Sequence, residues 1–465
     1  MKYLVENSLG RYWIDVLKAR GSEKSEKQIA DDFDWQYYMS SAPQNKKPDD
    51  IKLKDINIQD VTFIDPAMGS GHILVYAFDL LLQIYKSEGY TQKDAARLIL
   101  CKNLYGLDID TRAFQLTYFA LTMKARNIDR RFFKKGIALN VIDIPESDDS
   151  SALFCANLKH NIKGAANIEP LNKLISAFEH GNDLGSIIKF KDIDLFKIEN
   201  TLNSASNTDD LTIHQAELDH GSTQMHRMLN TAKILTKRFT VSVSNPPYMG
   251  AGKMDESLKK YIRKYYPDSK ADLFAVFIER MIELTKHSGY IAMITQHSWM
   301  FLSSFEKLRK KLQSKTIVNL AHLGTRAFEE IGGEVVQSAA FILKNEKAND
   351  YIGTYERLTE FGNSKDKEKN YLNAVKYPDV SYIFRSNQTN FLKVPGSPIV
   401  YWTTCIPNLF HNNKLLKDIS IIKSGLSTGN NDLYMRYWFE ISLLKYPFKS
   451  SLKKNMTSKG RNLFP

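Results

Sequence analysis

The chain has 465 residues, of which 43% are hydrophobic and 25% charged, and its formal net charge is +12. This composition is typical of a soluble globular protein with two or three domains, and the positive charge favours a nucleic-acid partner. Three widely spaced cysteines argue against a zinc site or a disulfide framework and predict a cytoplasmic protein without a bound metal. No apolar stretch reaches the roughly 18 residues of a membrane-spanning helix, and the first residues lack a signal-peptide pattern, so we expect no membrane partner.

Apolar segments before residue 145 predict strands that alternate with helices. We expect helices over residues 3–20, 73–85, 91–100 and 114–125, and strands over residues 61–64, 103–107 and 137–142. From about 145 to 238 the periodicity weakens and polar residues dominate, which predicts a mostly helical insertion with a flexible loop near residues 200–210.

Regular elements return after the insertion. We expect strands over residues 239–244, 290–294, 317–323 and 339–343, and helices over residues 273–286 and 304–312. Strands that alternate with helices over about 300 residues predict an α/β fold, with a largely parallel sheet covered on both faces. Residues 346–400 are less regular, and their charged run 365–369 predicts a solvated loop.

A glycine-rich segment, 65–71 (Asp-Pro-Ala-Met-Gly-Ser-Gly), lies between a predicted strand and a predicted helix. Gly69 and Gly71 let the backbone turn sharply and approach a ligand at the carboxyl edge of the sheet. The segment is neither GxGxxG nor a Walker A loop, because the lysine is absent. Asp65 disfavours a phosphate and favours a cation or an amine, both of which S-adenosylmethionine carries.

A second acid ends the next strand. Asp108 is placed as in nucleotide-binding sheets, where an acid accepts hydrogen bonds from ribose hydroxyls, and Ile109 would then flank the adenine ring. Asp110 is the alternative, or it caps the following helix. Asp143 and Asp183 both qualify as the acid that contacts the adenine amine of a cofactor, although a loop position explains either.

A third motif, 245–248 (Asn-Pro-Pro-Tyr), follows the apolar strand 239–244. The prolines cannot donate hydrogen bonds, and they hold the chain in an extended, rigid loop. Its carbonyl groups can accept hydrogen bonds from a planar amine, and the Tyr248 ring offers a stacking face. The motif is weak alone, and its order after the other two motifs makes it informative.

This order resembles that of the gamma-class amino-methyltransferases, which methylate N6 of adenine in DNA. It looks most similar to the PglX-type methyltransferases of bacterial BREX phage-defence systems, with 3–12 and 424–432 similar to local patterns of that family. The resemblance implies S-adenosylmethionine as cofactor, bound by Asp65, Pro66, Ala67, Gly69, Gly71, Asp108 and Ile109. It assigns catalysis to Asn245, Pro246, Pro247 and Tyr248.

In the implied mechanism, the Asn245 side-chain oxygen and the Pro246 carbonyl accept both N–H bonds of an adenine flipped out of double-stranded DNA, and Tyr248 stacks on the base. A second stacking aromatic is expected, but the sequence does not identify it. Other phage-defence proteins are further expected partners.

The resemblance also predicts the domain organisation. It implies a Rossmann-like catalytic domain over residues 1–345, including the insertion at about 145–238, and the start of a target-recognition region over residues 346–465. Compared with the family pattern, the chain looks like an internal piece of a longer enzyme.

Two other functions fit the same motifs. A methyltransferase of protein glutamine or RNA guanine also needs acceptors for a planar amide or amine. A catalytically inactive remnant or interaction subunit would keep the fold without turnover.

One basic segment has two interpretations. Residues 259–266 (Lys-Lys-Tyr-Ile-Arg-Lys-Tyr-Tyr) mix positive charge with aromatic rings, as a nucleic-acid groove would. At helical spacing, Tyr261 and Tyr265 are equally suited to core contacts, with the lysines facing water.

Overall fold

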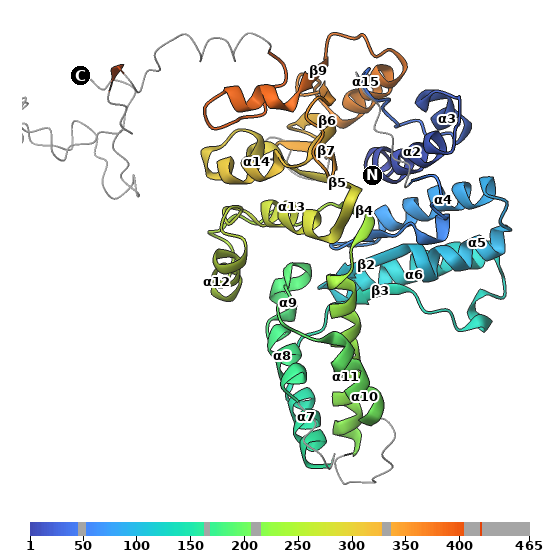
Figure 1. Ribbon diagram of the computed structural model, residues 1–465, viewed down its shortest axis with the longest axis vertical. Helices are drawn as coiled ribbons and strands as arrows, with labels where there is room; N and C mark the ends of the chain where they lie inside the picture. Colours follow the sequence, from blue (N-terminus) through green and yellow to red (C-terminus); the bar gives the residue numbers. More distant parts are fainter. Residues whose placement is uncertain (45–52, 162–167, 206–214, 328–335, 404–418, 421–465) are drawn as a thin grey trace, which may run out of the picture. The chain divides into compact units, whose positions relative to one another are not determined.

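The computed structural model describes residues 1–44, 53–161, 168–205, 215–327, 336–403 and 419–420. Nine strands form one sheet in the order β3-β2-β1-β4-β5-β7-β6-β8-β9 (Figure 1). The strands are β1 (Phe63–Asp65), β2 (Leu104–Asp108), β3 (Asn140–Asp143), β4 (Phe239–Ser244), β5 (Thr285–Gln296), β6 (Thr316–Gly324), β7 (Ser338–Lys344), β8 (Ile352–Arg357) and β9 (Ile383–Asn387). Strands β3, β2, β1, β4 and β5 run parallel, and β7 lies antiparallel between β5 and β6.

Fifteen α-helices occur in the described residues. They are α1 (Lys2–Val5), α2 (Arg11–Ala19), α3 (Glu26–Asp32), α4 (His72–Ser87), α5 (Gln92–Leu98), α6 (Thr111–Ile128), α7 (Asp149–Asn161), α8 (Glu169–Ala177), α9 (Gly181–Leu184), α10 (Leu195–Ala205), α11 (Gln215–Thr236), α12 (Glu256–Tyr265), α13 (Leu273–Leu284), α14 (Glu306–Leu312) and α15 (Ser364–Lys376). A π-helical turn, Glu6–Gly10, joins α1 and α2 into the predicted N-terminal helix. Every strand and helix expected before residue 345 is present, within a few residues of its predicted bounds.

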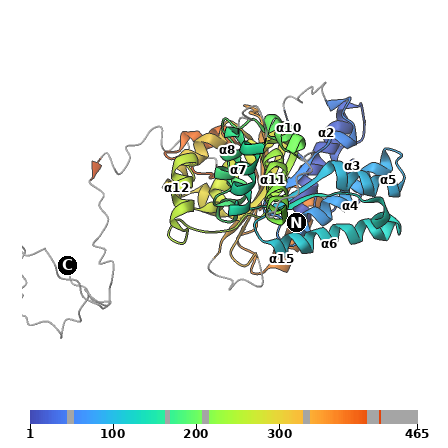
Figure 2. The ribbon, with the colours of Figure 1, turned by 90° about the horizontal axis from the view of Figure 1, so that it is seen from below.

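Alternate strand residues build a core on each face of the sheet. On one face, Phe63 and Val241 pack with the helices of the N-terminal third, including α2, α4 and α5. On the other, Ile64 and Met293 pack with α13, α14 and the insertion. Figures 1 and 2 show helices on both sides of the strands. The predicted α/β fold with two covered faces is confirmed.

The insertion between β3 and β4 is helical where it is described. Helices α7, α8, α10 and α11 lie together and extend away from the sheet (Figure 1). Ile198 and Met228 are among the buried side chains that hold these helices against one another. The prediction of a mostly helical insertion is confirmed. The expected loop at 200–210 is wrong for residues 200–205, which belong to α10, and residues 206–210 lie outside the described residues.

The prediction of a solvated loop at 365–369 is wrong, because these residues belong to α15. Lys367 is buried, and its Nζ donates to the carbonyl oxygens of Leu358, at 2.9 Å, and Phe361, at 2.6 Å. Tyr371, buried one turn later, fixes the helix against the N-terminal region by donating to the Tyr37 carbonyl at 2.9 Å. The charged residues of this segment therefore belong to an amphipathic helix, which the charged run alone did not indicate.

The sheet also continues beyond residue 345, since β8 pairs with β6 and β9 pairs with β8. The division into residues 1–345 and 346–465 stays a prediction, and most residues after 403, including the segment 424–432, lie outside the described part of the chain. Within the described residues, no helix is both long and apolar enough to cross a membrane.

Candidate active site at the carboxyl edge of the sheet

Asp65 ends β1 beside the end of β4. Its Oδ1 accepts hydrogen bonds from the Ala67 amide at 3.1 Å and from the Ser244 hydroxyl at 3.0 Å. Its Oδ2 is buried and has no hydrogen-bond partner among the described residues. Burial raises the pKa of Asp65 to about 7, and the nearby Asp108 charge adds to that shift. A buried carboxyl group with a free oxygen is suited to a cationic ligand.

The glycine loop turns directly after Asp65. Gly69 and Gly71 have φ angles of +53° and +78°, which glycine adopts without a steric penalty. A Cβ on Gly71 would lie 2.5 Å from the hydroxyl oxygen of Thr117, which donates to the Gly69 carbonyl at 2.8 Å. A Cβ on Gly69 would have no heavy atom within 4 Å. The loop is therefore packed against α6 at Gly71 and open at Gly69.

Asp108 ends β2 and holds the glycine loop. Its Oδ2 accepts from the Gly69 amide at 2.8 Å, and its Oδ1 accepts from the Asp110 amide at 2.9 Å. Asp110 itself caps α6, because its Oδ1 accepts from the Arg112 amide at 2.8 Å. Capping explains Asp110, so Asp108 is the better candidate for a ribose contact. Ile109 beside it is 49% exposed, as a residue that covers a ligand ring would be.

Both candidates for the adenine-contacting acid have partners. Asp143 accepts from the Arg227 guanidinium at 2.9 Å and from the Thr111 hydroxyl at 3.1 Å. Asp183 is exposed and accepts from the Ser257 hydroxyl at 3.2 Å. These bonds account for both acids structurally and do not select one as a cofactor ligand.

The Asn-Pro-Pro-Tyr loop leaves the end of β4. Asn245 is exposed, Pro246 is buried and Pro247 is exposed. The Tyr248 hydroxyl lies 3.3 Å from both Asn245 Oδ1 and the Ile294 carbonyl oxygen, and burial raises its pKa. The Asn245 side chain is thus held by one weak contact and keeps capacity to accept further hydrogen bonds.

Asp272, which the sequence analysis did not single out, anchors this loop. Its Oδ1 accepts from the Met249 amide at 3.1 Å and from the Phe274 amide at 3.3 Å, where it caps α13. The Leu273 amide donates a hydrogen bond to the Met249 carbonyl at 3.0 Å. An acid directly before an apolar helix was the available sequence signal, but it predicts only the cap.

Ser186, in the insertion, is the second residue that sequence reasoning missed. Its hydroxyl donates to the Pro66 carbonyl of the glycine loop. Arg280 of α13 donates to the Ser186 carbonyl and to the Leu235 carbonyl, each at 2.8 Å. The base of the insertion is therefore part of the site. No local pattern signals these contacts, which join residues far apart in the chain.

A cavity of about 240 Å³ opens beside Asn245. Ile73 of α4, Ile294 of β5 and Tyr3 of the N-terminal helix line it with other largely apolar residues. The edge of the sheet thus combines a buried carboxyl group, an exposed amide oxygen and a neighbouring cavity. This arrangement can bind a cation next to a planar amine.

Known proteins resemble this chain over most of its length. Residues 102–328 match the Eco57I restriction-modification methylase family. The chain is 47% identical over 460 residues to the adenine-specific methyltransferase PglX of Lacticaseibacillus casei (strain Zhang), covering 97% of this chain and 38% of that protein. It is 35% identical to the adenine-specific methyltransferase BrxX of Escherichia coli O9:H4 (strain HS), covering 95% of this chain and 37% of that one. The chain therefore spans less than two fifths of these relatives.

Among solved structures, the ATP-dependent Type ISP restriction-modification enzyme LlaBIII bound to DNA is similar, with a TM-score of 0.43 and 13% identity. That match covers 77% of this chain and 23% of the LlaBIII chain.

Proposed function

Because this chain is related over nearly its whole length to the PglX- and BrxX-type adenine-specific methyltransferases, we propose that it transfers a methyl group from S-adenosylmethionine to N6 of an adenine in DNA. The observation that carries the proposal is the Ser244–Asp65 hydrogen bond of 3.0 Å. It joins the strand that ends in a buried carboxyl group to the strand that presents Asn245. A site for a cation and an acceptor for an amine are thereby neighbours.

The residues around the glycine loop fit the cofactor. When bound, S-adenosylmethionine supplies a methyl group made electrophilic by its positively charged sulfur. The free Asp65 Oδ2 would hold a cationic group, and Gly69 would let the backbone come close. Asp108 would accept from ribose hydroxyls with the lone pairs its two amide partners leave free, and Ile109 would cover the adenine ring.

Asn245 and Pro246 would activate the target. An exocyclic adenine amine is a poor nucleophile because its lone pair is delocalised into the ring. Two carbonyl acceptors favour a tetrahedral nitrogen and direct that lone pair at the methyl group. Tyr248 would offset part of the few kcal/mol that unstacking the base costs, and the cavity beside Asn245 offers room for the base. Fixing both reactants in line would supply much of the acceleration.

The relatives favour this substrate over the other two functions considered for the sequence, since both are adenine-specific methyltransferases. No observation favours protein glutamine or RNA guanine. We extend the proposal to a cytoplasmic role in phage defence, alongside other defence proteins, as the sequence resemblance implies.

Calorimetric titration of S-adenosylmethionine, combined with transfer of a labelled methyl group to unmethylated plasmid DNA, tests the proposal. We expect the parent chain to bind the cofactor and to yield N6-methyladenine. Asp108→Ala should lose binding, whereas Asn245→Ala should keep binding and lose at least about a hundredfold in transfer rate. A folded parent chain that binds no cofactor would identify it as an inactive relative and end the proposal.

A further inference from the structure

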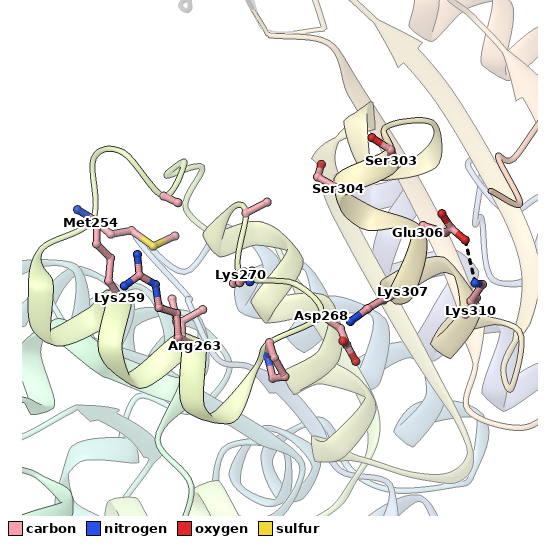
Figure 3. Close-up of a pocket in the computed structure, with 14 residues that line it drawn as sticks. Met254, Lys259, Arg263, Asp268, Lys270, Ser303, Ser304, Glu306, Lys307 and Lys310 are labelled. Atoms are coloured by element: carbon pink, nitrogen blue, oxygen red, sulfur yellow. Dashed lines mark ion pairs between the residues drawn. The ribbon is translucent and has the colours of Figure 1, made fainter. Parts of the chain in front are cut away.

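A basic pocket lies directly beyond the Asn-Pro-Pro-Tyr loop. It measures about 630 Å³, and its walls come from α12, α14 and the loops that precede α12 and α13 (Figure 3). Its lining residues are Ala251, Met254, Lys259, Ile262, Arg263, Pro267, Asp268, Lys270, Ala271, Ser303, Ser304, Glu306, Lys307 and Lys310. Five of these fourteen residues are lysine or arginine and two are acidic, so the pocket carries a net positive charge.

The acids of the pocket are already neutralised. Glu306 pairs with Lys310 at 2.8 Å, and Asp268 pairs with Lys311 at 2.8 Å. Four lining cations remain without an ion pair in the part of the chain that the structure describes: Lys259, Arg263, Lys270 and Lys307. Unpaired cations on several walls of one pocket are suited to a polyanion.

Helix α12 is fixed so that its basic side faces the pocket. On its other side, the Tyr261 hydroxyl accepts from the Lys189 amide at 2.7 Å. Just beyond its end, the buried Tyr266 hydroxyl donates to the Ile187 carbonyl at 2.8 Å. The tyrosines thus attach α12 to the insertion. Of the two interpretations of residues 259–266, Tyr261 therefore fits the structural contact and not the nucleic-acid groove. Lys259 and Arg263, one turn apart, line the pocket instead.

A backbone hydrogen bond connects the pocket to the segment that follows the Asn-Pro-Pro-Tyr loop. The Ala251 amide, three residues after Tyr248, donates to the Ala271 carbonyl at 3.0 Å, and both alanines line the pocket. A DNA strand that delivers an adenine to Asn245 must carry its negatively charged backbone past this loop. The unpaired cations of the pocket lie on α12, on α14 and on the loop before α13, close to the hydrogen-bonded segments that follow this loop.

We propose that this pocket binds backbone phosphates of the DNA strand next to the flipped adenine, with Lys259 and Arg263 as the main contacts. The inference rests on the proposed function and adds the surface that positions the substrate. Lys270, from the loop before α13, and Lys307, from α14, contribute from the other walls of the pocket (Figure 3). Because phosphate contacts carry no sequence information, this site supplies affinity and register and leaves base recognition to other parts of the enzyme.

Salt-dependent binding of a 30-base-pair duplex, followed by fluorescence anisotropy, tests the proposal. Each lost phosphate contact lowers the slope of log K against log salt by about 0.9. We expect Lys259→Gln/Arg263→Gln to reduce the slope by about 2 and to weaken binding roughly tenfold at low salt. The matched control, Lys260→Gln/Lys264→Gln, removes equal charge from the same helix outside the pocket and should leave the slope nearly unchanged.

An unchanged slope in the pocket variant, an equal loss in the control, or no duplex binding by the parent chain would each overturn the inference. Loss of binding to polyglutamate with unchanged duplex binding would assign the pocket to an acidic protein instead. Lys270→Gln/Lys307→Gln provides a second test on exposed residues, where folding is least at risk. Cofactor titration of every variant separates the two hypotheses, because failure of the proposed function appears there and failure of the pocket appears only with DNA.

Discussion

Two aspartates at neighbouring strand ends have different surroundings. Asp108 accepts two backbone amides and so fixes the glycine loop before any ligand arrives. Asp65 is more deeply buried and keeps one oxygen without a partner among the described residues. An unsatisfied buried carboxyl group costs free energy, which a cationic ligand can recover on binding. We therefore propose that Asp65 makes the site at the glycine loop selective for a positively charged ligand.

Cofactor affinity should depend on pH through Asp65. With a pKa of about 7, the free site is largely protonated at pH 6 and ionised at pH 8. A cation prefers the ionised form, so affinity is fully present above pH 7 and is lost as pH falls through that value. We expect about tenfold weaker binding of S-adenosylmethionine at pH 6 than at pH 8. Calorimetry in two buffers of different ionisation heat measures the accompanying proton release, and Asp65→Asn should bind weakly without this dependence.

Sequence reasoning succeeded for residues whose role is set locally. Asp65 and Asp108 each end a strand and Asn245 directly follows one, and the structure places all three at the same edge of the sheet. It failed for the loop contact of Asp272 and for Ser186, because their partners Met249 and Pro66 are 23 and 120 residues away in sequence and depend on how helices pack. Assigning the roles of these residues in cofactor and substrate binding remains a proposal.

At the scale of elements, the glycine loop is closely packed against α6 at Gly71. Thr117 contacts Gly71 through its side chain and Gly69 through a hydrogen bond, so helix and loop hold each other in place. Loop position and the position of Asp108 are coupled by the Gly69 amide. A shift of α6 would therefore displace the glycine loop and Asp108 together.

Gly71→Ala and Gly89→Ala form a matched pair that tests this fit. Both glycines have positive φ angles, +78° and +85°, but only a Cβ at Gly71 meets neighbouring atoms. Gly89→Ala should cost about 1 kcal/mol of unfolding free energy, from backbone strain alone. Gly71→Ala should cost roughly 3 kcal/mol, because steric overlap with Thr117 adds to the strain. Urea unfolding measures both, and equal losses would show that the contact with α6 is unimportant.

The strands before residue 345 were predictable because each is a short apolar run bounded by polar or turn residues. Strand β9 and helix α15 were not, since most side chains of β9 are only half-buried and α15 is rich in lysine. Tyr371, Ala374 and Val375 form the buried stripe of α15 at helical spacing. That stripe is too short to stand out against the charges around it.

At the scale of the whole described fold, the insertion and the sheet are tied together at Arg280. This buried guanidinium donates to two carbonyl groups of the insertion, those of Ser186 near its middle and Leu235 near its end, and lies 3.3 Å from Glu283. The same Ser186 contacts the glycine loop. Arg280 thus connects α13 to the insertion and, through Ser186, to the glycine loop.

Arg280→Leu should destabilise the protein by about 3 kcal/mol, because two buried carbonyl groups lose their donors. Urea unfolding would measure the loss, and cofactor titration should show weaker binding, since Ser186 is no longer held. Arg280→Lys keeps the charge and one donor direction and should fall between the parent and Arg280→Leu. A variant as stable as the parent would mean that the insertion is held by its apolar contacts alone.

Strand β4 lies inside the sheet, next to β1, but it is synthesised long after β1. Thr62 and Thr240, which hydrogen-bond across the β1–β4 boundary, are 178 residues apart. At synthesis rates of about 5–20 residues per second, β1 leaves the ribosome roughly 10–35 s before its neighbour. During that interval one edge of β1 is open to pairing with other chains. Such a long-range strand pairing favours slow refolding, and the edge of the sheet that carries Asp65 and Asn245 is completed only when β4 has been inserted.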